Sequence, residues 1–146
     1  MINMDDIERV VSFFESIEKS DWNTLQEIIA DDFKYFESTP DPIGKEIWLD
    51  FQIAIQTAFP DWAYNIQKVE RINNAIEVTV SITGTHLGEL NLPIEGFSSL
   101  PATRRKIHMP EEHALISLEN GKIKELRIEQ KLHGSLPGLL EQLGVE

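Results

Sequence analysis

The stretch AIEVTVSITGTH, residues 75–86, alternates apolar and polar side chains and indicates the fold class of the chain. One face carries the apolar residues Ile76, Val78, Val80 and Ile82. The other face carries glutamate, threonine and serine, and His86 continues the apolar phase at the end. A period of two is typical of a β-strand with one face buried against a core. We therefore expect this segment to lie inside a sheet that packs on one side only.

Helical patterns precede this strand, and further strands follow it. Apolar residues recur at three- and four-residue spacing in 4–19 and in 45–59, which predicts two helices. Asp21 can cap a further short helix between them, and DDFKYFE, residues 31–37, alternates as a short strand. Strand patterns continue in 64–72, 106–109, 113–119 and 122–132, and LPGLLEQLG, residues 136–144, ends the chain as a helix. Helices followed by a run of antiparallel strands predict an α+β fold, and the length predicts one domain over residues 1–146.

The composition restricts the partners that we expect. The chain of 146 residues is 41% hydrophobic and 26% charged, with a formal net charge of -12 and no cysteine. Such an acidic surface repels phosphate backbones and anionic lipids, so we expect no nucleic acid and no membrane partner. The absence of cysteine excludes disulfides and thiolate metal sites. The first residues, MINMDDIERVV, are acidic and no long apolar run follows, so we expect a cytoplasmic protein.

The segment HMPEEH, residues 108–113, gathers two histidines and two glutamates but does not have the spacing of a metal site. In an extended strand, His108 and His113 are an odd number of residues apart and point to opposite faces. In a helix, Pro110 would break the hydrogen-bond ladder, and the spacing differs from HExxH. We therefore expect no metal here, and we expect a strand, a proline-directed turn or bulge, and a second strand.

Four stretches in the same order resemble one protein family. They are AFPDW (58–62), ITGTHLGEL (82–90), ENGKI (119–123) and GLLEQLG (138–144). Together they resemble the SnoaL-like polyketide cyclase, or ester cyclase, family of the nuclear-transport-factor-2-like superfamily, over nearly the whole chain. The resemblance implies a cone-shaped, cystatin-like fold, in which a curved antiparallel sheet packs against N-terminal helices. It also implies a pocket for a hydrophobic small molecule, chemistry without metal or cofactor, and a homodimer or higher homo-oligomer.

The acid/base residue of those cyclases does not transfer to this chain. The resemblance implies an aspartate near the end of the last long strand, a few residues before the final helix. Counting from Gly121 leads to Lys131, and counting back from Gly138 leads to Ser135, so neither position holds an aspartate.

Three other residues are candidates for general acid/base chemistry. His113 begins the strand HALISLE, where this fold tends to face the pocket. An ordinary histidine side chain gains and loses a proton near neutral pH, which suits general acid/base chemistry. Glu129 and Arg127 share one face of the last strand. The resemblance implies that this face lines the pocket, if it corresponds to the face that carries the acid/base residue in the cyclases. Glu129 is then the base and Arg127 keeps it ionised. The alternative for His113 is a half-exposed histidine at the start of a strand. The alternative for Arg127 and Glu129 is a solvated or interfacial strand face that carries a ladder of ion pairs.

Aromatic residues supply candidates for the pocket wall. We expect substrate contacts from Tyr35, Trp48, Phe51, Trp62, His86 and Phe97, although side chains of this kind are also typical core residues. Phe97 belongs to residues 87–103, a long segment without a predicted element of its own, which is typical of a lid or partner surface.

Two functions from different classes agree with the sequence. The first is a cyclase-type enzyme that performs aldol cyclisation or isomerisation of a hydrophobic carbonyl compound by general acid/base catalysis. The second is a ligand-binding or dimerisation module that has lost the cyclase acid/base. The missing aspartate favours the module, while His113, Arg127 and Glu129 favour the enzyme.

Overall fold

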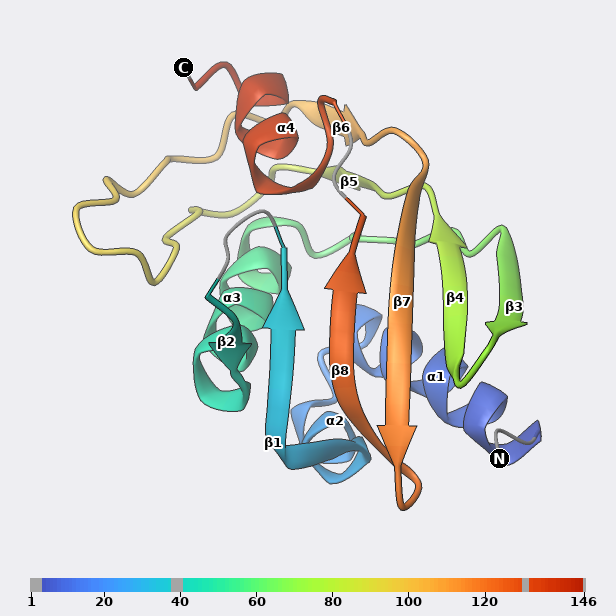
Figure 1. Cartoon of the computed structure of the whole chain (residues 1–146). Coiled ribbons are helices and arrows are strands. Elements are labelled where there is room, and N and C mark those ends of the chain that lie inside the picture. The colour runs from blue at the N-terminus through green and yellow to red at the C-terminus, as the bar shows by residue number, and fades with distance from the viewer. Residues whose placement is uncertain (1–3, 38–40, 130–131, 146) are drawn as a thin grey trace.

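The computed structural model describes residues 4–37, 41–129 and 132–145 (Figure 1). Its helices are α1 (Met4–Glu18), α2 (Trp22–Ile28), α3 (Lys45–Ala58) and α4 (Ser135–Gln142). Its strands are β1 (Ile29–Phe36), β2 (Ile43–Gly44), β3 (Lys68–Ile72), β4 (Ala75–Val80), β5 (Thr83–Thr85), β6 (Lys106–His108), β7 (Glu112–Glu119) and β8 (Lys122–Ile128). The predicted α+β fold is confirmed.

The main sheet has the strand order β2-β1-β8-β7-β4-β3. Its neighbouring strands pair antiparallel except for β1 and β8, which pair parallel, so the sheet is predominantly antiparallel, as the resemblance implies. The stretch 75–86 does not form one strand: β4 ends at Val80, and β5 pairs with β6 in a separate two-stranded sheet. HMPEEH spans the end of β6, a short connection without regular structure and the start of β7, so the two predicted strands are present.

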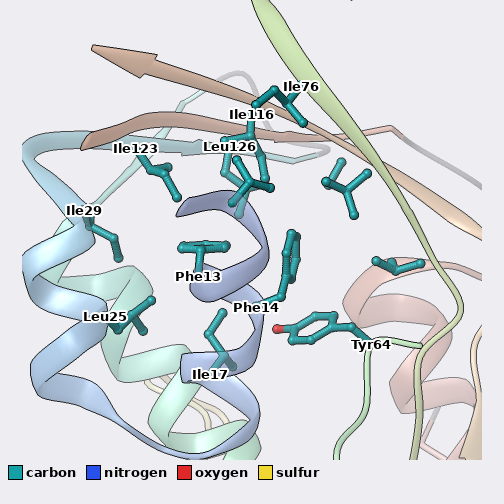
Figure 2. Close-up of a cluster of buried hydrophobic side chains, with 14 of the residues drawn as sticks. Phe13, Phe14, Ile17, Leu25, Ile29, Tyr64, Ile76, Ile116, Ile123 and Leu126 are labelled. Atoms are coloured by element: carbon teal, nitrogen blue, oxygen red, sulfur yellow. The ribbon is translucent and has the colours of Figure 1, made fainter. Parts of the chain in front are cut away.

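Helices α1, α2 and α3 cover one face of the main sheet and enclose the larger core (Figure 1). Figure 2 shows Phe13 and Phe14 of α1 facing Ile116 of β7 and Leu126 of β8. Phe13 and Ile116 are fully buried. The opposite face of the sheet carries the alternate residues of each strand, which are mostly charged or polar.

A second core lies next to the first, between α3, the small sheet and α4. Its buried residues are Ile55, Ala58, Phe59, Leu90, Leu92, Ile107, Met109, Leu139 and Leu143. The predicted long segment 87–103 belongs here, because Leu90 and Leu100 form a β-bridge and the side chains of Leu90 and Leu92 are buried. None of the described helices is long and apolar enough to cross a membrane.

The aspartate of AFPDW joins two parts of this second core. Asp61 accepts hydrogen bonds at 2.7 Å from the Thr85 backbone N–H and at 2.7 Å from the Thr85 hydroxyl. Partial burial acts to raise the pKa of Asp61, but the hydrogen bonds from Thr85 outweigh it and hold that pKa below its ordinary value of 3.8. Asp61 therefore connects the end of α3 to β5 through its ionised form.

We expect Asp61→Asn to lower the free energy of unfolding by about 1 kcal/mol at pH 7, because the charge-assisted bonds become ordinary ones. A lowered pKa in the folded state stabilises above the pKa of the unfolded state, and that contribution disappears as the pH falls through the folded value. We expect the difference in the free energy of unfolding between wild-type protein and Asp61→Asn to be smaller below the ordinary pKa of 3.8 than at pH 7, which urea unfolding at both pH values measures. Asp50→Asn, at an exposed position of α3, is the control. An equal effect of both substitutions at pH 7 would contradict the role of Asp61.

Helix α4 lies across the end of the main sheet at which β1 and β8 finish and β7 begins (Figure 1). Its Gly138 packs so closely that an added Cβ would overlap the backbone carbonyl of His133. The glycine of the GLLEQLG stretch is therefore required by backbone contact. We expect Gly138→Ala to lower the free energy of unfolding by about 1–3 kcal/mol, as overpacking does. Gly44→Ala is the matched control, because a Cβ at Gly44 meets nothing within 4 Å. Similar urea midpoints for both variants would contradict this explanation.

Candidate active site

A cavity of about 210 Å³ lies between the helices and the main sheet. Its wall is mostly apolar and comes from α1, α3, α4, β1, β2, β7 and β8, together with Glu37, Trp62, Tyr64, Ile82 and Met109 between the elements. Phe13, Phe14, Trp48 and Tyr64 connect the cavity to the larger core, where Phe13 stacks on Trp48 at 5.5 Å between ring centroids. Cavities of this kind are the default location of a small-molecule site.

Polar side chains enter this wall mainly at the end of the sheet below α4. Tyr35 and Glu37 come from the end of β1 and the residue after it, Glu112 begins β7, and Ser135 begins α4. Gln52 of α3 adds one amide. Because the ends of β1 and β8 and the beginning of β7 lie at the same edge of the sheet, residues distant in the chain meet here (Figure 1).

Glu112 is the most deeply buried carboxyl group of this wall, with 4% of its surface exposed. It shares the inner face of β7 with Ala114 and Ile116, which are also buried. Its Oε1 accepts a hydrogen bond of 2.6 Å from the Ser135 backbone N–H and lies 3.3 Å from the Ser135 hydroxyl. The carboxyl group is therefore held in one orientation at the N-terminus of α4.

Tyr35 supplies the second polar group. Its hydroxyl donates a hydrogen bond of 3.1 Å to Glu37 Oε1. Burial first, and then the charge of Glu37, raises the pKa of Tyr35 well above its ordinary value, and Glu112 contributes in the same direction. Tyr35 is therefore a neutral hydroxyl group at any physiological pH. Burial likewise raises the pKa of Tyr64, which also lines the cavity.

The three residues predicted to perform acid/base chemistry lie on the other face of the sheet. His113 Nδ1 lies 3.1 Å from the Thr79 hydroxyl and 3.9 Å from Glu77 Oε1. Arg127 makes an ion pair of 3.2 Å with Glu125 and covers the Phe36 ring at 3.8 Å. Glu129 is exposed, and its N–H bonds the carbonyl of His113.

The predicted orientation of these residues is therefore reversed in the structure. The inner phase of β8 is Leu126 and Ile128, which line the cavity, and the charged phase lies on the outer face, where Arg127 pairs with Glu125. No bulge intervenes between residues 125 and 129 to exchange the two faces, since the register shift lies before Glu125. Burial of the apolar phase is the more favourable choice for a strand with one charged and one apolar face.

Of the predicted substrate-binding residues, Tyr35, Trp48, Phe51 and Trp62 line the cavity. His86 and Phe97 do not, because both belong to the second core. The His86 ring is fully buried, stacks on Phe59, and its Nδ1 lies 2.9 Å from the Thr103 hydroxyl. Phe97 packs against the residues of the second core. Neither residue is among those that line the cavity, and a role in binding for the other four stays a prediction.

The two positions reached by the family count have different outcomes. Lys131 lies outside the described residues. Ser135 lines the cavity and holds Glu112, so the count led to the partner of the buried carboxyl group. Sequence reasoning did not select Glu112 itself. A signal was present, because Glu112 stands two and four residues before Ala114 and Ile116 and so continues the apolar phase of the strand HALISLE.

Within the described residues, no group of three or more histidine and acidic side chains is placed to hold a metal ion. The chemistry open to this wall is that of two carboxyl groups, two neutral phenols, a serine hydroxyl and an amide among aromatic and aliphatic side chains. Such a set can move a proton at a bound molecule and hydrogen-bond its oxygen atoms.

Comparison with known proteins supports the relationship seen in the four stretches. The family model for the SnoaL-like polyketide cyclase matches residues 8–136. The chain belongs to this family. A comparison with curated protein sequences gives no match.

Solved structures of the SnoaL-like type share the fold of the chain. A candidate SnoaL-like polyketide cyclase from Jannaschia sp. CCS1 is 19% identical with a TM-score of 0.73, over 95% of this chain and 92% of that one. IdmH, a candidate polyketide cyclase from Streptomyces antibioticus, is 22% identical with a TM-score of 0.72, over 96% and 99%. AclR, a candidate hydroxylase from Streptomyces galilaeus, is 14% identical with a TM-score of 0.75, over 95% and 84%. At these identities the likeness concerns the fold, which hosts different reactions.

Proposed function

We propose that this protein is a cyclase-type enzyme that transfers protons on a hydrophobic carbonyl compound without a cofactor. The observation that carries the proposal is Glu112, a buried carboxyl group that lines an apolar cavity and is fixed by Ser135. Glu112 replaces Glu129, His113 and Arg127 as the candidate for proton transfer, because the side chains of those three residues lie on the outer face. Membership of the polyketide cyclase family supports the reaction class.

The proposed reaction begins with removal of a proton from the carbon next to a carbonyl group. The Glu112 carboxylate accepts this proton, and the electrons of the C–H bond move into an enolate. The enolate carbon then attacks a second carbonyl carbon of the same molecule, which forms the C–C bond of an aldol ring. The resulting alkoxide takes back the proton from Glu112. If the proton returns to a different carbon and no bond forms, the outcome is an isomerisation.

The other lining residues assist by position. Tyr35, neutral because of its raised pKa, can hydrogen-bond a substrate oxygen atom without adding negative charge beside an enolate. The aromatic wall holds the apolar part of the substrate and excludes water. Proton transfer by a positioned group contributes on the order of 10²–10⁴-fold, and orientation and electrostatics add to it.

One observation favours the second candidate, a ligand-binding module without catalysis. Glu112 Oε1 already accepts hydrogen bonds from Ser135, so the carboxyl group has a structural role at the start of α4. A hydrogen-bonded carboxylate can still act as a general base, however, so a structural role at α4 and proton transfer are compatible.

Exchange of substrate protons with solvent tests the first step alone and does not require the natural substrate. A bicyclic aryl ketone such as α-tetralone suits the cavity, since cavities of about 150 Å³ already hold benzene. We expect the protein to accelerate the loss of the α-proton signal in D₂O, followed by proton NMR. Binding of the ketone without faster exchange would favour the binding module. The homo-oligomer implied by the family stays a prediction, which sedimentation equilibrium would test.

A further inference from the structure

One hydrogen-bond donor of the cavity wall, the indole N–H of Trp48, finds no acceptor among the described residues. The nitrogen atom is buried, and Trp48 as a whole is only 2% exposed, so bulk water does not reach it. A buried donor without a partner is costly, and native proteins contain few of them. A molecule bound in the cavity is a source of the missing acceptor.

Trp48 belongs to the face of α3 that lines the cavity. Phe51 and Ile55 of the same helix line it as well, at the spacing of one helix face. The indole ring stacks on Phe13 with 14° between the ring planes, and it contacts Phe33 at 5.1 Å between ring centroids. These contacts fix the direction of the N–H before a ligand binds, which is the preorganisation that a binding or catalytic donor needs.

The other tryptophan of the wall, Trp62, differs from Trp48. Its Nε1 also makes no hydrogen bond of ordinary geometry within the described part of the chain. Burial raises the pKa of the Tyr64 hydroxyl and the Trp62 N–H acts in the opposite direction, so this N–H faces the Tyr64 oxygen. Trp62 is also only partly buried. Of the two indole donors, Trp48 is therefore the one that is better placed to serve a ligand.

We propose that the Trp48 N–H is the donor that recognises the carbonyl oxygen of the substrate. The proposal rests on the proposed function, since it names a further residue of the same site. An indole N–H is uncharged and can only donate, so it favours a carbonyl compound over a hydrocarbon of the same shape. When Glu112 takes the proton from the neighbouring carbon, the electron pair of the C–H bond moves towards this oxygen. The hydrogen bond from Trp48 strengthens as the negative charge develops, and the indole keeps its own proton.

Two bicyclic compounds test the recognition: α-tetralone and tetralin, the hydrocarbon that lacks its oxygen atom. Isotope-labelled wild-type protein has three tryptophans and therefore three indole N–H signals in a nitrogen–proton correlation spectrum. Trp22→Phe and Trp62→Phe each remove one signal, which leaves the signal of Trp48. We expect α-tetralone to move this signal downfield, as a new hydrogen bond does, and tetralin to move it much less. The measurement requires no catalysis and no change of Trp48.

Trp48→Phe keeps an aromatic ring at this position and removes the N–H. We expect it to lower the affinity for α-tetralone about three- to tenfold, the contribution of one neutral hydrogen bond, and to alter the affinity for tetralin less than about twofold. The rate of α-proton exchange at saturating ketone should fall further, by about 10²-fold, because the lost bond is strongest with the enolate. Trp22→Phe is the matched control and should change neither quantity, since Trp22 packs against the larger core and is not among the lining residues.

The outcomes separate this proposal from the proposed function. Equal movement of the Trp48 signal by both compounds, or an equal loss of affinity for both in Trp48→Phe, would overturn the role of Trp48. The same holds if α-tetralone does not bind. A Trp48 response without proton exchange would uphold the recognition of the oxygen atom and overturn the proposed function. Proton exchange that Trp48→Phe leaves unchanged would support the proposed function and overturn the contribution of Trp48 to it.

Discussion

Replacing Glu112 with glutamine is expected to lower the rate of α-proton exchange about 10²–10⁴-fold, the usual contribution of a positioned general base. Glutamine has nearly the same shape, and its amide oxygen can still accept the Ser135 N–H that Glu112 Oε1 accepts at 2.6 Å. It cannot take a proton from carbon. The measurement is the exchange rate in D₂O at saturating ketone, compared with wild-type protein.

Glu111→Gln is the matched control for this substitution. Glu111 is the neighbouring residue, is exposed, and does not line the cavity. We expect its exchange rate to equal that of wild-type protein. Loss of exchange in Glu129→Gln but not in Glu112→Gln would restore the residue selected from the sequence and overturn the proposal for Glu112.

Glu112→Ala separates the chemical role of this residue from its structural one. Alanine removes the acceptor of the partly buried Ser135 N–H, which costs about 1–3 kcal/mol when no other partner replaces it. We therefore expect both glutamine and alanine to stop exchange, and only alanine to lower the urea midpoint clearly. If glutamine lowers the urea midpoint as much as alanine does, the loss of exchange cannot be assigned to the missing base.

The contrast between Glu112 and His113 shows where sequence reasoning about the site stopped. Both residues stand in HMPEEH, and the choice between them depends on which face of β7 turns inward. Alternation gives the two faces, and the apolar residues Ala114 and Ile116 identify the inner one. The prediction instead chose His113 for the familiar chemistry of histidine, and it chose Glu129 by analogy with the strand face that carries the acid/base residue in the cyclases. A buried glutamate is rare enough that pattern alone argues against it, and its hydrogen bond from Ser135, 23 residues away, cannot be read from the pattern.

The fold could be predicted further than the site because it depends on signals that repeat. Periods of two and of three to four residues indicated the helices and most strands, and Asp21 caps α2 by accepting the Thr24 N–H as expected. The end of β4 at Val80, inside the alternating stretch 75–86, could not be predicted from the sequence, because Ser81 and Ile82 continue the alternation without a glycine or proline. The parallel pairing of β1 with β8 also leaves no local trace, since it joins strands that are distant in the chain.

The second large effect concerns Phe13, which lies where the larger core meets the cavity. Its side chain is fully buried, its ring is stacked on Trp48 at 5.5 Å, and it contacts Phe14 edge to face at 5.1 Å (Figure 2). Phe13→Ala removes these contacts and joins the vacated space to the cavity. We expect the free energy of unfolding to fall by about 3–5 kcal/mol, the usual cost of such a truncation. Urea unfolding of the variant and the wild-type protein measures it.

Phe36→Ala is the control that separates burial from the mere loss of a phenyl ring. Phe36 lies on the outer face of the sheet, where its ring is covered by the Arg127 guanidinium, and that contact is worth only about 0.5–1 kcal/mol at an exposed site. A much smaller loss of stability is therefore expected there. Because Phe13 also lines the cavity, its truncation should let bulkier ketones bind, which a change of Phe36 should not do. Equal losses of stability in the two variants would mean that the inner face of the sheet is not the main core.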